Sequence, residues 1–374
     1  MRATARTPQE MNDKSALAAI ESDLLSIDVP ATGRLLGSEG TQLQIVADQQ
    51  GIKVDVTLGF PAASWISALR ERIQAVVDGA GAGQARIDVE TRIESHSVAH
   101  GLKPLPGVKN IIAVASGKGG VGKSTIAANL AVACALEGAA VGLLDADIYG
   151  PSQPTMLGLE SARPESTDGK SMEPLIAHGL QTMSIGYLVD DRQPMAWRGP
   201  MVTSALTQLL NQTNWKDLDY LFVDMPPGTG DIQLTLAQRV PVSGAIIVTT
   251  PQNVALADAR KAAEMFRKVN VPLLGIVENM STHVCSSCGH EEPVFGTAGG
   301  SALAAEYEVP LLGQLPLVLD VRAAADAGTP AVALDPAAAV AIRLREIAQR
   351  VAGELAATGR DYSHLFPKIS VEDA

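Results

Sequence analysis

Hydrophobic and polar residues follow two different repeats within the first 95 residues of the chain. Two stretches, 14–27 and 64–77, place apolar side chains every three or four residues as amphipathic helices do, and Ser64 is a candidate cap for the second. Three further stretches alternate apolar and polar side chains, as half-buried strands do: 41–47, 51–58 and 85–93. The order α-β-β-α-β predicts a small two-layer α+β domain over residues 1–95.

Later in the chain the apolar runs become continuous, which is typical of strands that are buried on both faces. Five such runs occur: 110–116, 139–147, 220–226, 244–251 and 273–280. Helical patterns separate several of them: 123–137, 200–211, 254–269 and 336–357. This alternation predicts a doubly wound, mostly parallel α/β sheet over residues 107–360, joined to the first domain by a linker at 96–106 and followed by a C-terminal tail at 361–374.

Composition narrows the range of functions. The 374 residues include 46% hydrophobic side chains, enough for the cores of two domains. A formal net charge of -12 at pH 7 disfavours nucleic acid as a partner, because the phosphate backbone would be repelled. No run approaches the roughly 18 apolar residues of a membrane span, and the N-terminus lacks a signal-peptide pattern. With only three cysteines, we expect a cytoplasmic protein without a membrane partner.

The segment GKGGVGKS at 117–124 matches the phosphate-binding pattern G-x-x-x-x-G-K-[ST], between a predicted strand and a predicted helix. Glycines allow successive backbone N–H groups to surround phosphate oxygens, Lys123 adds a positive charge, and Ser124 can bind Mg²⁺. Lys118 is an additional lysine that the pattern does not require. The candidate binding residues of this loop are Gly117, Lys118, Gly119, Gly120, Val121, Gly122, Lys123, Ser124 and Thr125.

Acidic residues follow two of the predicted buried strands. Asp224 ends one of them, where a carboxylate can hold the water shell of Mg²⁺. Asp145 and Asp147 end another, near the edge of the sheet at which ligands bind in open α/β folds. A helix-capping or turn role is an alternative for one of these two carboxylates.

The loop sequence KGGVGKST, with its lysine at position 118, resembles the deviant Walker A motif of the MinD/ParA class of P-loop ATPases. The resemblance implies that the nucleotide is ATP, that Lys123 contacts the phosphates within its own subunit, and that Lys118 reaches the ATP of a second copy. It therefore implies a homodimer that closes around ATP. In the same class an acid at the position of Asp147 orients the attacking water, so Asp147 is the candidate for hydrolysis.

Cys285 and Cys288 form a C-x-x-C pair after the last of the continuous apolar runs. Two thiolates can share one metal centre, but a closed site needs four ligands. The pair could complete a local zinc knuckle with His283 and His290, form a redox disulfide, or meet a second copy across a twofold axis and hold a [4Fe-4S] cluster. The third cysteine, Cys134, lies among apolar residues of a predicted helix and is expected to be a buried structural thiol.

Five blocks of sequence resemble the Mrp/ApbC family of iron–sulfur cluster carrier proteins, within the same ATPase class. They are KGGVGKST, LLDADIYGPSQPTMLGL, VDMPPGTGD, ENMS followed by C-x-x-C, and LGQLPLVLDVRAAADAGTP. The resemblance implies that Cys285 and Cys288 bind a [4Fe-4S] cluster at the dimer interface, and that the cluster passes to apo-proteins under the control of slow ATP hydrolysis. Ser124, Asp147 and Asp224 are the candidate Mg²⁺ residues, and an assembly scaffold is a further implied partner. The first domain resembles small proteins of iron–sulfur assembly, although the cysteine of that module is not evident.

Three residues are candidates for contacts with the rest of the nucleotide. Asn279, in ENMS, matches the class position that hydrogen-bonds adenine, and Pro316 and Asp320 are candidates to border the base or ribose. Two other functions fit parts of the sequence: a spatial-organiser ATPase of the MinD/ParA kind and a zinc-stabilised nucleotide-binding scaffold. The C-terminal sequence RDYSHLFPKISVEDA is neither basic nor strongly amphipathic, which disfavours the spatial organiser.

Overall fold

The computed structural model describes residues 14–29, 32–48, 51–98, 102–166, 168–189 and 199–359. The predicted C-terminal tail lies outside these residues, as does part of the predicted linker. The first elements are α1 (Lys14–Leu25), β1 (Asp28–Val29), β2 (Arg34–Leu35), β3 (Thr41–Asp48), β4 (Gly51–Leu58), α2 (Ile66–Gly79) and β5 (Arg86–Thr91). Every helix in the described ranges is too short or too polar to traverse a lipid bilayer.

The elements after β5 alternate between strands and helices. In chain order they are β6 (Val108–Ala115), α3 (Lys123–Leu136), β7 (Val141–Asp145), α4 (Gln153–Met156), β8 (Leu175–Ala177), β9 (Leu180–Ser184), a 3₁₀ turn (Ile185–Tyr187), α5 (Gly199–Gln212), β10 (Leu218–Asp224), α6 (Asp231–Arg239), β11 (Gly244–Thr249), α7 (Asn253–Lys268), β12 (Leu273–Val284), β13 (Glu291–Glu292), α8 (Gly299–Tyr307), β14 (Leu311–Leu317), α9 (Leu319–Asp326), α10 (Ala331–Leu334) and α11 (Ala339–Ala356).

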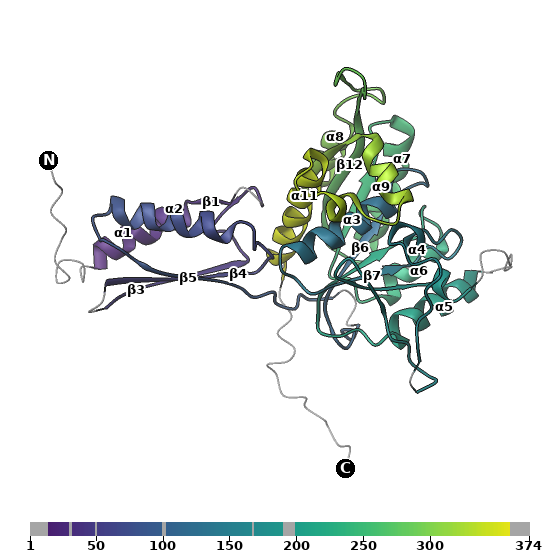
Figure 1. Cartoon of the computed structure of the whole chain (residues 1–374), viewed down its shortest axis with the longest axis horizontal. Helices are drawn as coiled ribbons and strands as arrows, with labels where there is room; N and C mark the ends of the chain where they lie inside the picture. Colours follow the sequence, from purple (N-terminus) through teal and green to yellow (C-terminus); the bar gives the residue numbers. More distant parts are fainter. Residues whose placement is uncertain are drawn as a thin grey trace, which may run out of the picture.

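The first elements form a small layered unit (Figure 1). β3 pairs antiparallel with β4, β4 pairs parallel with β5, and α1 and α2 cover one face of this sheet. Alternate residues of β4 are buried because successive side chains of a strand point to opposite faces: Ile52, Val54, Val56 and Leu58. Ser64, the expected cap of α2, makes no such bond. The helix begins at Ile66 with Trp65 in the capping position, and the hydroxyl of Ser64 donates to Glu137 instead.

The second sheet forms the centre of the larger unit. Its strands lie in the order β8-β9-β7-β10-β6-β11-β12, with β14 and the short β13 also pairing with β12. The interior pairs are parallel, and only β8 and β13 among the described strands of this sheet run antiparallel to their neighbours. The doubly wound, mostly parallel fold class predicted from the continuous apolar runs is therefore confirmed.

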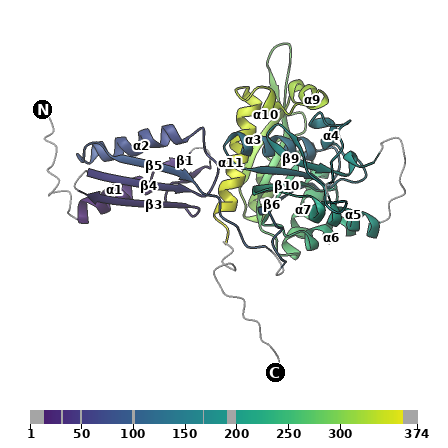
Figure 2. The same cartoon turned by 60° about the horizontal axis from the view of Figure 1, so that its bottom comes forward.

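Side chains of the central strand β6 alternate between two hydrophobic cores. Ile112 and Val114 belong to the core formed with α3, α10 and α11, whereas Ile111 and Ala113 belong to the core formed with α5, α6, α7 and α8. Figure 2 shows these helices in two layers on opposite sides of the strands. Because the parallel strands all end at one edge, the loops after β6, β7, β10 and β12 can meet there.

Polar contacts tie the small unit to two helices of the larger one. Glu137, buried at the C-terminal end of α3, accepts hydrogen bonds from the hydroxyl of Ser64 at 2.9 and 2.8 Å and from Arg345 of α11 at 2.6 Å. Arg34 forms a two-pronged ion pair with Glu354 of α11, at 3.0 and 2.9 Å. The small unit is thus held against α3, the helix that begins at the phosphate loop.

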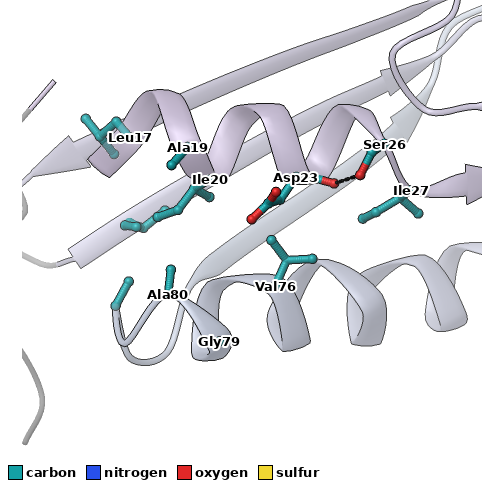
Figure 3. Close-up of a pocket in the computed structure, with 11 residues that line it drawn as sticks. Leu17, Ala19, Ile20, Asp23, Ser26, Ile27, Val76, Gly79 and Ala80 are labelled. Atoms are coloured by element: carbon teal, nitrogen blue, oxygen red, sulfur yellow. Dashed lines mark hydrogen bonds between the residues drawn. The ribbon is translucent and has the colours of Figure 1, made fainter. Parts of the chain in front are cut away.

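A cavity of about 730 Å³ lies within the small unit, between α1 and α2 (Figure 3). Apolar side chains that include Leu17, Ile20 and Val76 line it, and Asp23 contributes a carboxylate. All of its lining residues belong to the small unit, so this cavity is separate from the phosphate loop.

Candidate functional site

The predicted phosphate loop connects β6 to α3, which begins at Lys123. Gly120 and Gly122 have φ angles of 81° and 84°, in the left-handed region that favours glycine. A Cβ at Gly122 would lie 2.2 Å from the amide nitrogen of Asn279, so the Asn279 side chain would have to move away to admit one. Around Gly119 and Gly120, by contrast, no atom lies within 4 Å of where a Cβ would be. The backbone there is open to a ligand, as a loop that surrounds phosphate oxygens must be.

Lys123 and Asp224 form a buried ion pair beneath this loop. The lysine side chain is 6% exposed and the aspartate side chain 0%. Nζ of Lys123 also lies 3.3 Å from Oγ of Ser124, the residue predicted to bind Mg²⁺. Asp224, at the end of β10, therefore lies next to the loop, where the sequence predicts an acid for the Mg²⁺ water shell.

Gln153 bridges the same two positions and was not singled out by sequence analysis. Its Nε2 donates to the backbone oxygen of Ser124 at 3.1 Å and to Oδ2 of Asp224 at 2.9 Å. The side chain of Gln153 is fully buried. A single glutamine carries no pattern of its own, and the only signal in the sequence was its place shortly after β7, at the start of α4.

Asp145 has the turn role that the sequence left open for one member of the acidic pair. It ends β7 directly beside Asp224 on β10. Its carboxylate accepts three backbone N–H groups, each at 3.1 Å: those of Asp147, Ser152 and Gln153. Burial, followed by the charge of Asp224, raises the pKa of Asp145 to about 7. Asp145 thus organises the loop after β7 and is not free to contact a ligand.

Asp147 is half-buried, and its carboxylate accepts hydrogen bonds from the backbone N–H groups of Gly150 and Tyr149. Burial raises the pKa of Asp147, these hydrogen bonds lower it, and the charge of Lys123 lowers it whereas that of Asp224 raises it. The carboxylate is therefore close enough to both residues to sense their charges. The acid predicted for hydrolysis lies at the phosphate end of the site, and its role remains a prediction.

Lys118 lies half-buried within the loop. Its backbone oxygen accepts a hydrogen bond from the hydroxyl of Ser116 at 2.9 Å, which helps to fix the loop. Across the described ranges, no carboxylate forms an ion pair with its ammonium group. The role predicted for Lys118 is a contact with a second subunit, so that role also remains a prediction.

A second cavity, of about 330 Å³, adjoins the loop and extends away from the phosphate end. Thr125, Asn279 and Pro316 line it together with apolar side chains of α9 and α11. Nδ2 of Asn279 donates to the backbone oxygen of Val121 at 2.9 Å, so this amide contacts the loop directly. Asp320 lies outside the lining of the cavity. The lining is mostly apolar and also includes the polar side chains of Asn129, Arg322 and Asp326. Mostly apolar cavities with a few polar groups are typical of small-molecule sites, and the contact of Asn279 with a base remains a prediction.

The C-x-x-C pair lies beyond this site, on the hairpin between β12 and β13 that projects at the top of Figure 1. The backbone N–H of Cys285 donates to the oxygen of His290 at 2.9 Å, and that of Gly289 donates to the oxygen of Cys285 at 2.8 Å. Gly289 has a φ of 72°, which lets the chain turn back tightly. The turn is therefore shaped around the two cysteines, of which Cys285 is half-buried and Cys288 exposed.

The three thiols differ in their surroundings. Hydrogen bonds from the backbone N–H groups of Ser287 and Cys288 lower the pKa of Cys285, because they favour the thiolate. Thiolate is the form that binds metals. Cys134 on α3 is fully buried, as expected, and burial raises its pKa far above the ordinary value.

One chain offers an incomplete set of metal ligands. Within the described ranges, no group of three or more histidine, cysteine, aspartate and glutamate residues is placed to hold a metal ion. The local knuckle with His283 and His290 is therefore not formed in this structure. Cys285 and Cys288 supply two of the four ligands that a tetrahedral or cubane centre needs.

Comparison with known sequences gives close matches to the larger unit. A family model for ParA, described as the NUBPL iron-transfer P-loop NTPase, matches residues 107–352. An iron–sulfur cluster carrier protein of Pseudomonas fragi is 57% identical over 269 residues, which cover 72% of this chain and 94% of that protein. Another, of Salmonella typhimurium, is 63% identical over 249 residues, which cover 67% of this chain and 68% of that protein.

A solved structure resembles the same part of the chain. It is the nucleotide-binding protein of Archaeoglobus fulgidus in complex with ADP, which is 38% identical to this chain with a TM-score of 0.54. The match covers 60% of this chain and 88% of that protein.

Proposed function

This chain belongs to the ParA family of NUBPL iron-transfer P-loop NTPases, and from that membership we propose that it is an ATP-dependent iron–sulfur cluster carrier. Its cargo is a [4Fe-4S] cluster, held by Cys285 and Cys288 from each of two copies. The cluster passes to apo-proteins, and ATP binding with slow hydrolysis controls the transfer. An assembly scaffold supplies the cluster, and the reducing cytoplasm is the compartment in which such exposed thiols persist.

The strand β12 gives this proposal its strongest support. Asn279, in its second half, borders the nucleotide cavity, and Cys285 follows its last residue. Asn279 and the two cysteines thus lie on one strand and on the turn that directly follows it. A nucleotide that moves Asn279 can therefore change the position of the cysteines beyond the end of the same strand. A cluster carrier controlled by ATP requires such a connection.

A second copy of the chain completes both the cluster site and the ATP site. Two thiols per chain leave a [4Fe-4S] cluster two ligands short, and the twofold symmetry of a homodimer supplies the same pair again. Lys118, whose ammonium group has no carboxylate partner within the described chain, supplies positive charge to the ATP of the other subunit.

The residues of the loop fit Mg-ATP. The open backbone at Gly119 and Gly120 binds phosphate oxygens, and the hydroxyl of Ser124 and the carboxylate of Asp224 are oxygen ligands of the kind that Mg²⁺ prefers. Bound Mg²⁺ neutralises charge that develops on the phosphates. Lys123, which pairs with Asp224, would turn to the phosphates of the bound nucleotide.

Hydrolysis depends chiefly on orientation and charge, because the transition state of phosphoryl transfer is loose. Asp147 orients the attacking water from the loop after β7. Its half-buried carboxylate has a raised pKa, which makes it a better acceptor for a proton of that water than an exposed aspartate.

Anaerobic reconstitution with iron and sulfide tests the proposal. We expect the parent protein to bind about four iron and four acid-labile sulfide per dimer, and to pass them to an apo-ferredoxin at a rate that Mg-ATP changes. Cys285→Ser and Cys288→Ser lose the cluster, whereas the matched control Cys134→Ala retains it, since that thiol is buried on α3.

Three outcomes would contradict this function. Zinc without acid-labile sulfide in the anaerobically purified protein favours the zinc-stabilised scaffold. Cluster retention by both hairpin variants removes the thiols from the site. A monomer under every nucleotide and cluster condition, measured by analytical ultracentrifugation, excludes the shared centre.

A further inference from the structure

Gln153 occupies an unusual position between the phosphate loop and the end of β10. It is the first residue of α4, and its side chain is 0% exposed. Its amide nitrogen contacts Ser124 O at 3.1 Å and Asp224 Oδ2 at 2.9 Å. Ser124 and Asp224 are two of the three candidate Mg²⁺ residues, and one amide group spans them.

The orientation of this amide follows from its partners. A backbone oxygen and a carboxylate oxygen can only accept hydrogen bonds, so the group that faces them is the NH₂ of Gln153 and not its oxygen. The oxygen, Oε1, is bonded to the same carbon as that nitrogen. It is buried, and it has no hydrogen-bond partner in the part of the chain that the structure describes.

An unpartnered buried acceptor is costly, and native proteins normally supply it with a donor. The donors that the proposed function brings to this place are the water molecules bound to Mg²⁺. A glutamine that served only to fill space would not need a polar atom on this side. The hydroxyl of the neighbouring Ser152 is also buried without a partner in the described chain, so two consecutive residues leave polar atoms without a hydrogen bond.

The backbone of Gln153 is fixed as firmly as its side chain. Its N–H donates to Oδ2 of Asp145 at 3.1 Å, and the same oxygen accepts from Ser152 N–H and from the hydroxyl of Ser184, each at 3.1 Å. The buried Asp145 carboxylate thus anchors the segment from which Gln153 reaches the loop. Gln153 cannot move away without breaking this anchor.

We propose that Gln153 is a positioning residue for the metal of the nucleotide complex: its NH₂ group holds Asp224 and the loop at Ser124 at a fixed separation, while its oxygen accepts a hydrogen bond from a metal-bound water. This inference rests on the proposed binding of Mg-ATP. It assigns different tasks to the two oxygens of Asp224. Oδ1 pairs with Lys123 and is released when the lysine turns to the phosphates, whereas Oδ2 stays with Gln153.

Metal binding to the ADP complex tests this role without relying on catalysis. The probe is Mn²⁺, titrated into the full-length protein with saturating ADP and followed by electron paramagnetic resonance. The variant Gln153→Met keeps the length of the side chain and removes both hydrogen-bonding atoms. We expect Mn²⁺ to bind about tenfold more weakly, because hydrogen bonds to charged groups typically change a binding constant by that much. ADP affinity in EDTA stays within about twofold of the parent.

The control is Gln349→Met, the same change at a glutamine that is 6% exposed on α11. It leaves both affinities unchanged. If methionine at 153 lowers the melting temperature of the free protein sharply, Gln153→Ala, which adds no new atoms, takes its place in the titration.

Three results overturn the inference, and they can be distinguished from one another. If the parent binds Mn²⁺ with ADP and Gln153→Met binds it equally well, Gln153 has no part in positioning the metal. The same conclusion follows if metal-dependent and metal-free ADP affinities fall by the same factor, since that indicates loss of packing alone. If the parent itself binds no Mn²⁺–ADP, the proposed function fails and this inference with it.

Discussion

Replacing Asp224 with asparagine is expected to strengthen the binding of Mg-free nucleotide, although Asp224 is a candidate Mg²⁺ residue. In the free protein the charge of Lys123, which is 6% exposed, is balanced by that of Asp224. A bound phosphate offers the same lysine a second partner, so binding exchanges one ion pair for another. Asp224→Asn removes the carboxylate that Lys123 pairs with in the free protein, whereas in the bound state Lys123 contacts a phosphate instead. The substitution therefore destabilises the free state more than the bound state.

The size of the effect follows from the burial of the pair. Removing one partner from a buried ion pair typically costs about 3–5 kcal/mol, because the other charge remains buried. The lower end applies here, since Lys123 keeps its contact with Ser124 at 3.3 Å and an asparagine oxygen can still accept from Gln153. If phosphate restores about half of 3 kcal/mol, the dissociation constant for Mg-free ADP falls about tenfold. The free variant is expected to melt roughly 6–12 °C below the parent.

Isothermal titration with ADP in EDTA and calorimetric melting of the free protein measure these two quantities. Asp219→Asn is the matched control on the same strand, where the aspartate pairs with a 46% exposed lysine, Lys109, at 2.8 Å. It should change stability far less and leave ADP affinity unaltered. Equal or weaker binding of Mg-free ADP by Asp224→Asn would refute the reasoning, because it would mean that phosphate does not take Lys123 from Asp224.

Two further perturbations test other parts of the structure. Iodoacetamide at about pH 7.5 is expected to alkylate Cys285 before Cys134, since hydrogen bonds lower the pKa of the first thiol and burial raises that of the second. Mass spectrometry of the native and unfolded protein measures the order of alkylation, and modification of Cys134 first would contradict this prediction. Glu137→Gln removes the negative charge of the carboxylate that accepts hydrogen bonds from Ser64 and Arg345, so the free energy of unfolding in urea should fall by about 2–3 kcal/mol. An unchanged unfolding midpoint would mean that these contacts between the small and the larger unit do not stabilise the protein.

The sequence predicted the central sheet and the phosphate loop well because both depend on local signals. A strand buried on two faces must be apolar throughout, as the register of β6 between β10 and β11 requires. The loop needs glycine wherever φ is positive or a neighbour is too close, as at Gly122 beside Asn279. Such constraints determine which residue type occupies the position itself, so they can be recognised in the sequence.

Other features of the site could not be predicted because they depend on partners distant in sequence. Asp145 and Asp147 look equivalent along the chain, and only the fold of the loop after β7 brings the N–H groups of Ser152 and Gln153 to the first of them. Gln153 matters because of Ser124 and Asp224, 29 and 71 residues away. Ser64 failed as a helix cap for the same reason, since the carboxylate of Glu137 competes for its hydroxyl.

The path by which nucleotide could influence the thiols passes through an irregular part of β12. Met280, next to Asn279, has a φ of 54°, and the pairing of β12 with β14 shifts register between Asn279 and His283. Met280 also lines both the nucleotide cavity and a smaller one of about 240 Å³ beneath the hairpin. A regular ladder would hold the hairpin rigidly, whereas a bulged strand can change its local conformation without losing its outer pairs. Because the amide of Asn279 contacts Val121 and is predicted to contact the base, we expect any adjustment on nucleotide binding to fall on Met280 and to reach Cys285 from there.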